Sequence, residues 1–351
     1  MKRAVVAVVV SLLLLVGHAG PAGAGTTYTH FGATNNVGLS VQWSQALFPG
    51  SGSAPTAILV RSDSFADSLA AGALAGFVRA PIFLHPSTGG LDPRIEGELS
   101  RLGTDLVRVI GGTSAISAQT VDDLVAAGYD VHRLAGANRI DTAVQVMQQT
   151  SDSDGNSLYE GSSFVYLARA FGTGSTAFAD SIGAGMIAGT QGIPLLLSAT
   201  EALSAETRTA LSAAPEVETV FIVGGTAAIS GAVETELRGM GLEVERVAGP
   251  DRFETAARIA DESFDPALPG IIALVDGLNA NSWASGYPAA AMAGGAVVLS
   301  NGDSLPDPTA SFLTSQNGSG AHLYCAPEVG HDACLLADEL LNGPPATTIG
   351  G

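Results

Sequence analysis

The chain has 351 residues, of which 46% are hydrophobic, and a formal net charge of −19 at pH 7. A hydrophobic share this large can fill the cores of several domains, which excludes an intrinsically disordered chain. The negative charge argues against nucleic acid as a partner, because a long-range negative field repels a phosphate backbone.

The first 25 residues have the pattern of a secretory signal peptide. Lys2 and Arg3 precede an apolar run over 4–16, and the small residues at 22–24 resemble a cleavage site. We therefore expect a secreted protein that works at the cell wall or cell surface. No later segment approaches the roughly 20 apolar residues of a membrane span, so no transmembrane helix is expected.

Strand-length apolar runs alternate with helix-length amphipathic segments in the first third of the chain. The strand candidates lie at 57–60, 81–85, 106–110 and 130–134. The helices between them are expected to begin near Asp67, Pro93, Ser117 and Arg139. Continuous apolar strands separated by helices predict a parallel sheet covered on both faces, which is an α/β fold.

Three segments of this region return at one fixed interval, 113 residues between Asp67 and Asp180. The pairs are FADSLAAG at 65–72 with FADSIGAG at 178–185, VIGGTSAIS at 109–117 with IVGGTAAIS at 222–230, and RLAGANRIDTA at 133–143 with RVAGPDRFETA at 246–256. The chain is therefore a tandem array of one folding unit.

A third copy is degenerate, and the front of the chain carries a partial echo. ASGYPAAAMAG at 284–294 aligns with ADSIGAGMIAG at 179–189 and has Ser285 in the aspartate position. NNVGLSVQWSQ at 35–45 parallels NRIDTAVQVMQ at 138–148. The predicted domains are a signal peptide at 1–25, repeat units at 26–132, 133–245 and 246–341, and a flexible tail at 342–351.

Asp67 and Asp180 precede runs of small residues at the start of a predicted helix. There a carboxylate can accept hydrogen bonds from the free amides of the first helical turn. The alternative is an acid pair for hydrolysis. Replacement by serine in the third copy favours the cap, because a catalytic acid does not tolerate that change.

Two glycine pairs, Gly111-Gly112 and Gly224-Gly225, follow a predicted strand and precede a helix. Amides at such a helix start can hold an anion. Neither copy completes a G-x-G-x-x-G or a phosphate-loop motif, however, which favours a strand-to-helix turn that needs a positive φ.

Arg61 and Arg169 end the first strand of their units. Ligands of open α/β sheets bind beyond the carboxyl ends of the strands, so these arginines are ligand-binding candidates, with a plain surface role as the alternative.

Arg139 and Arg252 are further ligand-binding candidates, each followed by a carboxylate and then by Thr142 or Thr255. A salt bridge between adjacent units is an equally good interpretation for both. The front echo has Asn36 in the place of the arginine, so the contact is not expected three times.

No nucleophile elbow or zinc-protease motif occurs, and the histidines are dispersed without a repeated metal spacing. We therefore expect neither an enzyme nor a metal or cofactor site. Cys325 and Cys334 lie close together in the third unit of an exported chain, where a disulfide is plausible.

The motifs R-x-x-G-x-x-R-x-x-T-A, F-A-D-S-[LI] and [IV]-G-G-x-x-A-I-S resemble the cell wall-binding repeat 2 family. The resemblance covers nearly all of the chain after residue 25 and weakens in the last unit. It implies Rossmann-like units in a pseudo-threefold arrangement, an intramolecular pseudo-trimer. It also implies noncovalent binding of an anionic secondary polymer of the cell wall.

Three functions remain open at this point. The first is a binding module for an anionic wall glycan. The second is an envelope enzyme that acts on glycans and uses the repeat as a scaffold. The third is a structural protein of surface assembly. Fold alone does not separate them.

Overall fold

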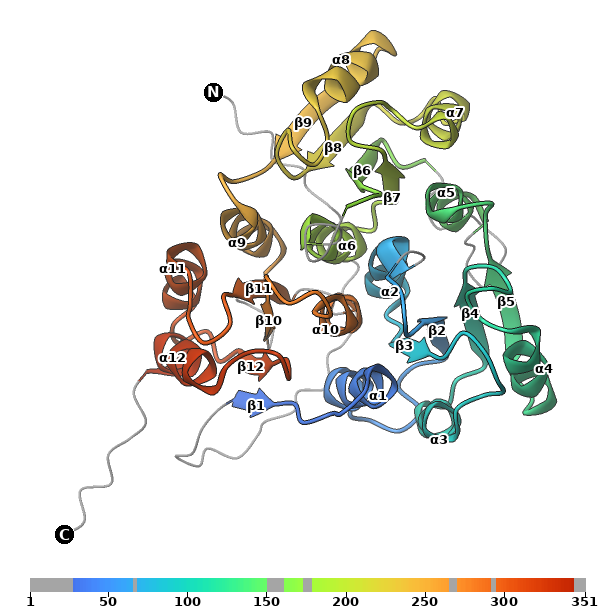
Figure 1. Cartoon of the computed structure of the whole chain (residues 1–351), viewed down its shortest axis with the longest axis vertical. Helices are drawn as coiled ribbons and strands as arrows, with labels where there is room; N and C mark the ends of the chain where they lie inside the picture. The colour runs from blue at the N-terminus through green and yellow to red at the C-terminus, as the bar shows by residue number, and fades with distance from the viewer. Residues whose placement is uncertain are drawn as a thin grey trace.

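The computed structural model describes residues 28–65, 68–149, 161–172, 179–264, 270–291 and 295–343. These residues form three four-stranded sheets, each wholly parallel and each flanked by helices (Figure 1). The α/β fold class predicted from the alternation of strands and helices is confirmed. The predicted signal peptide and most of the predicted tail lie outside the described residues.

The first sheet has the strand order β3-β2-β4-β5. Its strands are β2 (Thr56–Arg61), β3 (Ile82–His85), β4 (Leu106–Ile110) and β5 (Asp130–Leu134). Its helices are α1 (Asn36–Leu47), the 3₁₀ turn η1 (Ser68–Ala70), α2 (Ala71–Val78), α3 (Pro93–Leu102) and α4 (Ala118–Ala126). Every strand predicted for this unit is present, within a residue or two of its predicted limits.

The second sheet repeats this order as β7-β6-β8-β9. Its strands are β6 (Phe164–Arg169), β7 (Leu195–Ser198), β8 (Thr219–Val223) and β9 (Glu243–Val247). Its helices are α5 (Arg139–Gln149), α6 (Ala179–Gln191), α7 (Ala205–Ala213) and α8 (Gly231–Gly239).

The third sheet is completed by the start of the chain, and its order is β11-β10-β12-β1. Its strands are β10 (Ile271–Asp276), β11 (Ala296–Ser300), β12 (His322–Cys325) and β1 (Tyr28–His30). Its helices are α9 (Arg252–Ser263), α10 (Trp283–Ala289), α11 (Asp307–Ser315) and α12 (His331–Asn342). Strand β1 thus takes the place that β5 and β9 take in the other two sheets.

The local sequence explains where these elements begin and end. Strands β3, β7 and β11 are buried along their whole length, as expected for apolar strands covered on both faces. Helix α3 begins after Asp92, whose side chain accepts a hydrogen bond from the amide of Arg94, and ends at Gly103 with a φ of 64°.

The three central helices, α2, α6 and α10, lie between the sheets (Figure 1) and contact one another. A Cβ added at Gly76 would lie 2.8 Å from the Cα of Gly189, and a Cβ added at Gly72 would lie 3.2 Å from the Cα of Gly185. Because only glycine permits so close a backbone approach, the small-residue runs of the sequence serve the packing of the units against one another.

Cys325 at the end of β12 and Cys334 in α12 form a disulfide, and both side chains are buried. The bridge fixes α12 to the third sheet. Within the described ranges, no helix is both long enough and apolar enough to cross a membrane.

Candidate functional site

The central strand of each sheet ends in a polar residue beside a second polar residue on the neighbouring strand. In strand register, Arg61 lies next to His85, Arg169 next to Ser198, and Asp276 next to Ser300. We call this carboxyl end of each sheet the strand-end site of its unit. Parallel α/β sheets bind their ligands at this end.

Arg61 and Arg169 end β2 and β6 as predicted, but their surroundings differ. The Nε of Arg61 donates to Asp63 at 2.7 Å, and the Arg61 side chain is one quarter exposed. The hydrogen bond from Arg61 lowers the pKa of the Asp63 carboxyl. In the second unit, Nη1 of Arg169 donates to the carbonyl of Ala227 at 3.4 Å.

The third unit reverses the charge at this position. Asp276 replaces the arginine, is 8% exposed, and accepts a hydrogen bond from the amide of Leu278 at 2.8 Å. The three strand-end sites are therefore not chemically equivalent, and only the first two carry a cation at the end of the central strand.

The glycine pairs form the strand-to-helix turn that the sequence favoured. Gly111 and Gly224 have φ angles of 101° and 98°, a backbone conformation in which other residues are strained. Each turn is held by an arginine, because Nη1 of Arg133 and of Arg246 donates at 2.7 Å to the carbonyl of Gly111 and Gly224 respectively. The first arginine of the repeated motif thus fixes this turn.

The second arginine of the motif holds the end of the central strand of its own unit. Nη1 of Arg139 donates to the carbonyl of Ala170 at 2.9 Å, and Nη1 of Arg252 donates to the carbonyl of Gly277 at 2.6 Å. Both acceptors directly follow the central strand of the same unit. These contacts are hydrogen bonds to the backbone. The salt bridge between units and the ligand contact that the sequence suggested stay predictions.

The segment 35–45, which parallels 138–148, makes the same contact although it has Asn36 in the place of the arginine. From the sequence alone, this contact was not expected a third time. Nδ2 of Asn36 donates to the carbonyl of Ser62 at 2.8 Å, directly after β2. Asn36 also exchanges hydrogen bonds with Asn281 of the third unit. A shorter side chain suffices here because its amide already lies within reach of the carbonyl.

The motif threonines are buried and bond the backbone. Oγ1 of Thr142 accepts from the amide of Gly136 at 3.2 Å, and Thr255 accepts from Gly249 at 2.9 Å. A Cβ at Gly249 would lie 2.2 Å from the Glu254 side chain, so glycine is required at that position. These threonines support the arginine-bearing segment.

Aromatic side chains gather around Arg139 where the units meet, a feature that the sequence reasoning missed. The Arg139 guanidinium lies 5.5 Å from the ring centroid of Phe65 and 5.2 Å from that of Phe171, a cation–π arrangement. The Phe65 ring lies 6.4 Å from that of Trp283. Phe171 is 48% exposed. The repeated aromatic residue before each helix was the available signal.

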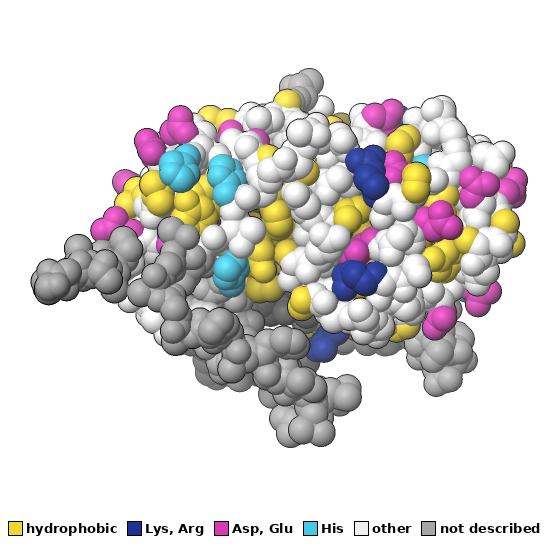
Figure 2. Space-filling view, turned by 90° about the horizontal axis from the view of Figure 1, so that it is seen from below, with side chains coloured by type: hydrophobic (Ala, Val, Ile, Leu, Met, Phe, Trp, Pro, Cys, Tyr) yellow, Lys and Arg dark blue, Asp and Glu magenta, His cyan; other side chains and the backbone are white. Residues whose placement is uncertain are grey.

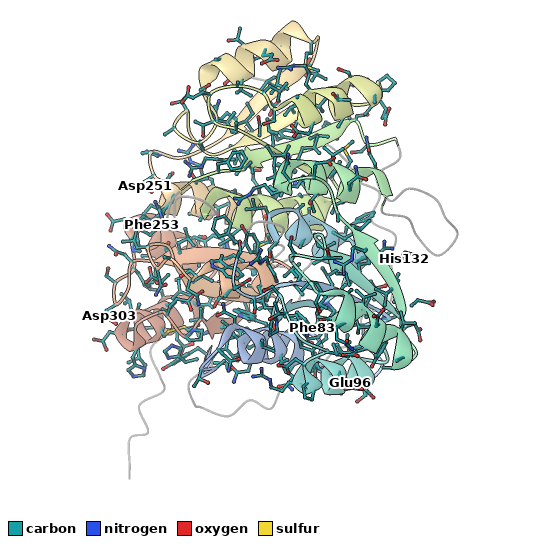
Figure 3. All side chains as sticks on the ribbon, turned by 45° about the vertical axis from the view of Figure 1, so that its right-hand side comes forward. Phe83, Glu96, His132, Asp251, Phe253 and Asp303 are labelled. Carbon is teal, nitrogen blue, oxygen red and sulfur yellow. A yellow bond between two sulfur atoms is a disulfide. The ribbon has the colours of Figure 1, made fainter. Side chains whose placement is uncertain are left out.

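The start of α9 lies beside the end of the central strand of the third sheet. Figure 3 labels Asp251 and Phe253 there, where α9 approaches the third sheet. A Cβ at Gly277 would lie 2.9 Å from the Phe253 ring. The Asp251 side chain caps α9 by accepting from the amide of Glu254 at 2.9 Å.

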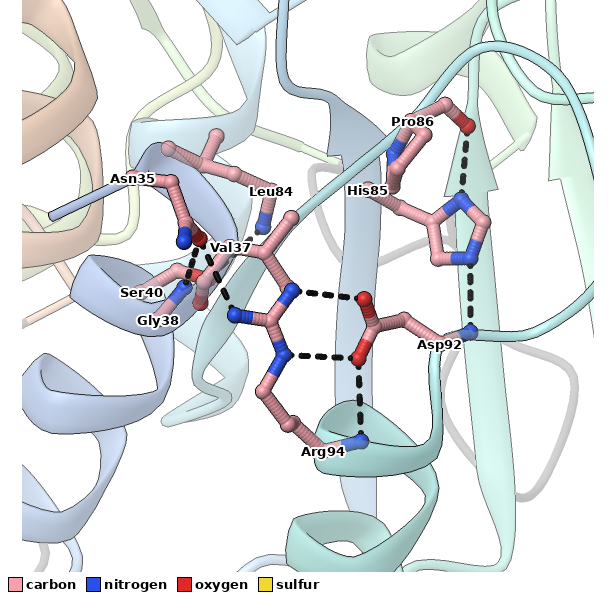
Figure 4. Close-up of polar contacts among 9 residues, drawn as sticks. All are labelled: Asn35, Val37, Gly38, Ser40, Leu84, His85, Pro86, Asp92 and Arg94. Carbon is pink, nitrogen blue, oxygen red and sulfur yellow. Dashed lines mark hydrogen bonds and ion pairs between the residues drawn. The ribbon is translucent and has the colours of Figure 1, made fainter.

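A polar network surrounds the strand-end site of the first unit (Figure 4). Nδ1 of His85 bonds the carbonyl of Pro86 at 2.7 Å, and its Nε2 accepts from the amide of Asp92 at 3.0 Å. Burial lowers the pKa of His85, so the neutral imidazole is favoured. Arg94 joins Asp92 to Asn35, the cap of α1. These contacts position the strand ends and hold no free acid–base pair.

Two predicted residues cannot be placed in these networks. Asp67 lies outside the described residues, and Asp180 is the second residue of α6 with its side chain outside them. Among the side chains that the structure describes, no group of three His, Cys, Asp or Glu residues is arranged to hold a metal ion.

Figure 2 shows one face of the molecule with a few separated basic side chains to the right of its centre, histidines to the left, and acidic side chains mainly toward both flanks. That face has no continuous basic patch. The fold and the strand-end sites together define a repeat module of three α/β units that presents polar groups at the carboxyl ends of its sheets.

The chain belongs to the family Cell wall binding domain 2, whose model matches residues 31–121, 133–234 and 246–333. The predicted family resemblance is confirmed. Each matched region contains the three strands β2–β4, β6–β8 or β10–β12 of one sheet.

Two curated proteins are similar to parts of this chain. The chain is 26% identical to the N-acetylmuramoyl-L-alanine amidase LytC of Bacillus subtilis, over 82% of this chain and 53% of LytC. It is 30% identical to an uncharacterized protein of Pyrococcus horikoshii, over 53% of this chain and 52% of that protein. The chain therefore spans about half the length of the curated relatives it matches.

Two structures from Clostridium difficile share the fold. Cwp8 aligns with a TM-score of 0.72 at 22% identity, covering 91% of this chain and 52% of Cwp8. Cwp6 aligns with a TM-score of 0.73 at 18% identity, covering 91% of this chain and 49% of Cwp6.

Proposed function

We propose that this chain is a noncovalent cell-wall binding module that recognises an anionic secondary polymer of the wall. The observation that carries the proposal is the match of the family model to all three units, each of which has polar residues at the carboxyl end of its sheet. Under this proposal residues 1–25 direct export, and the units 26–132, 133–245 and 246–341 act outside the cell.

Arg61 and Arg169 are the residues proposed to contact the polymer. Both end a central strand, and guanidinium groups bind carboxylate or phosphate through paired hydrogen bonds. In a protein with a net charge of −19, an anionic ligand needs such local cations. Arg139 and Arg252 are proposed to shape the site, because each holds the carbonyl after a central strand.

Binding is tested with cell walls purified before and after chemical removal of their secondary polymers. We expect retention of the protein on intact walls and its loss on stripped walls. Retention on both would indicate peptidoglycan as the ligand, and retention on neither would reject the proposal. Because LytC is an amidase, release of peptide from the same walls is measured in parallel, and such release would favour an enzyme.

The site residues are tested with the double variant R61A/R169A. We expect the double variant to bind intact walls at least about tenfold more weakly than wild type, since a hydrogen bond to a charged group contributes on the order of 1.5–3 kcal/mol. The control is R208A/R258A, which removes the same charge from exposed helix positions paired with Glu236 and Glu254. Equal affinity of the two double variants would show that only net charge matters.

A further inference from the structure

Equivalent positions of the three central helices meet inside the molecule. A Cβ at Gly72 would lie 3.2 Å from the Cα of Gly185 and 3.3 Å from the Cβ of Ala290. Counting back five residues from each position leads to Asp67, Asp180 and Ser285. The structure thus supports the alignment in which the third unit has serine in place of the aspartate.

Strand register gives a second correspondence, on the opposite side of the strand-end site. The paired residues of the two middle strands are Leu59 with Val109, Leu167 with Ile222, and Leu274 with Cys325. Three residues beyond the second member of each pair stand Gly112, Gly225 and Glu328. The third unit therefore has a glutamate where the other units have the second glycine of the pair.

The space next to this position differs between the units. Among the described residues, a Cβ at Gly112 or at Gly225 would meet no atom within 4 Å. In the third unit a glutamate occupies the position, and Oγ of Ser285 donates to Oε2 of Glu328 at 3.2 Å. Compared with the first two units, the third unit lacks a carboxylate at residue 285 but has one at residue 328, within hydrogen-bond distance of Ser285.

This carboxyl group has unused hydrogen-bonding capacity. Oε1 of Glu328 is buried and has no hydrogen-bond partner among the described residues, and the same holds for the hydroxyl of Ser300. The Ser282 hydroxyl lies close enough to the Glu328 carboxyl to lower its pKa as a hydrogen-bond donor. Ser282, only 1% exposed, lies beside the Glu328 carboxyl, and Ser300 is the register partner of Asp276. Buried polar atoms are seldom left unpaired, which indicates a partner that supplies both donors and acceptors.

We propose that Glu328 replaces, in the third unit, the carboxylate that the other units carry at Asp67 and Asp180, and that it accepts a hydrogen bond from a hydroxyl group of the wall glycan. The inference rests on the proposed function. Since Asp276 stands where the other units have arginine, the third unit takes an uncharged, hydroxyl-bearing part of the polymer. The first two units take its anionic groups.

Burial and electrostatics are consistent with this assignment. Burial raises the pKa of Glu328 to about 7, with a smaller contribution from the negative charge of Asp276. A hydroxyl that donates to the carboxylate would favour its charged form and offset part of that effect. A second anion would be repelled by the same pair of carboxyl groups.

The test compares E328Q with two double variants, S285D/E328G and S285A/E328G. The probe is the secondary polymer released from purified walls, titrated in its native form and after its acidic groups are neutralised. We expect E328Q to bind about tenfold more weakly, S285D/E328G to bind within about twofold of wild type, and S285A/E328G to bind as weakly as E328Q. If S285D restores binding in the absence of Glu328, binding depends on a carboxylate at this place in the site and does not require residue 328 itself to supply it.

The outcomes separate this inference from the proposed function. If wild type binds the native polymer and E328Q binds equally well, the role of Glu328 is rejected while the proposed function stands. If wild type does not bind, both are rejected. With the neutralised polymer, E328Q should still bind more weakly than wild type, whereas R61A/R169A should bind as well as wild type. The reverse pattern would overturn the assignment of the uncharged part of the polymer to the third unit. Thermal unfolding of each variant identifies loss through misfolding.

Discussion

At the scale of single residues, the repeated motif is explained mainly by the fold. Arg133, Arg139 and Thr142 each bond a backbone group, and their counterparts Arg246, Arg252 and Thr255 make the matching bonds. A side chain that satisfies a backbone carbonyl or amide is costly to remove, because the orphaned group loses its partner without regaining water. The strand-end sites are therefore built on a framework that the motif residues hold in place.

Glu328 gives a pH-dependent prediction at this scale. An unperturbed glutamate has a pKa of 4.5, whereas burial raises the pKa of Glu328 to about 7, so the folded state holds the proton more tightly. This contribution to stability is fully present below pH 4.5 and is lost as the pH rises through 7. The pKa difference corresponds to on the order of 3 kcal/mol.

The variant E328Q mimics the protonated group and should remove this dependence. We expect the free energy of unfolding of E328Q to equal that of wild type near pH 4.5 and to exceed it at about pH 8, above the raised pKa. Urea titrations at both pH values, followed by circular dichroism, measure it. A wild-type stability that rises with pH across this window relative to E328Q would contradict the assigned pKa direction.

Strand-end residues could be predicted from the sequence, whereas contacts between units could not. The apolar run before Arg61 places that residue at the end of a buried strand, and β2 ends there. Arg139 contacts the Phe65 ring of the first unit, and no local pattern specifies that partner. Glu328 was missed because its position is visible only through strand register.

At the scale of elements, the contact between α2 and α6 depends on glycine. Gly72 and Gly76 of α2 face Gly185 and Gly189 of α6, and each pair is four residues apart. Residues four apart share one helix face, so the glycines form a flat strip on which the two backbones meet. The sequence shows the runs of small residues, and the structure shows that the run in α2 packs against the run in α6.

The prediction at this scale is that G76A destabilises the protein although alanine favours helices. The added Cβ would lie 2.8 Å from the Cα of Gly189, which forces the helices apart, and such overpacking costs about 1–3 kcal/mol. The control is G97A in α3, where a Cβ meets no atom within 4 Å and the helix gains up to about 1 kcal/mol. Chemical denaturation measures both; equal stability of the two variants would show that the backbones do not meet.

At the scale of the whole molecule, the two ends of the described chain meet in one sheet. Strand β1 pairs with β12 in the register Tyr28 with Leu323 to His30 with Cys325. The sequence predicted three units in tandem order. The segment 35–45 parallels 138–148, which follows β5, and this was the only sign in the sequence that the residues before it repeat β5 and β9. Pairing between strands so far apart in the chain leaves no local signal.

We predict that the third sheet depends on this pairing. Removal of residues 28–33 deletes β1, the hydrogen bond from the amide of Phe31 to the carbonyl of Cys325, and the stacking of the Phe31 ring on Tyr324. Phe31 is 8% exposed, and burial of such a side chain contributes about 2 kcal/mol. Amide hydrogen exchange in β12 should therefore become at least about tenfold faster, while β4 and β8 keep their protection.

A synthetic peptide of residues 26–34, added in excess, should restore protection of β12, because the register of β1 is set by backbone pairing and by Phe31. Unchanged exchange in β12 after the deletion would show that the third sheet is stable without the start of the chain.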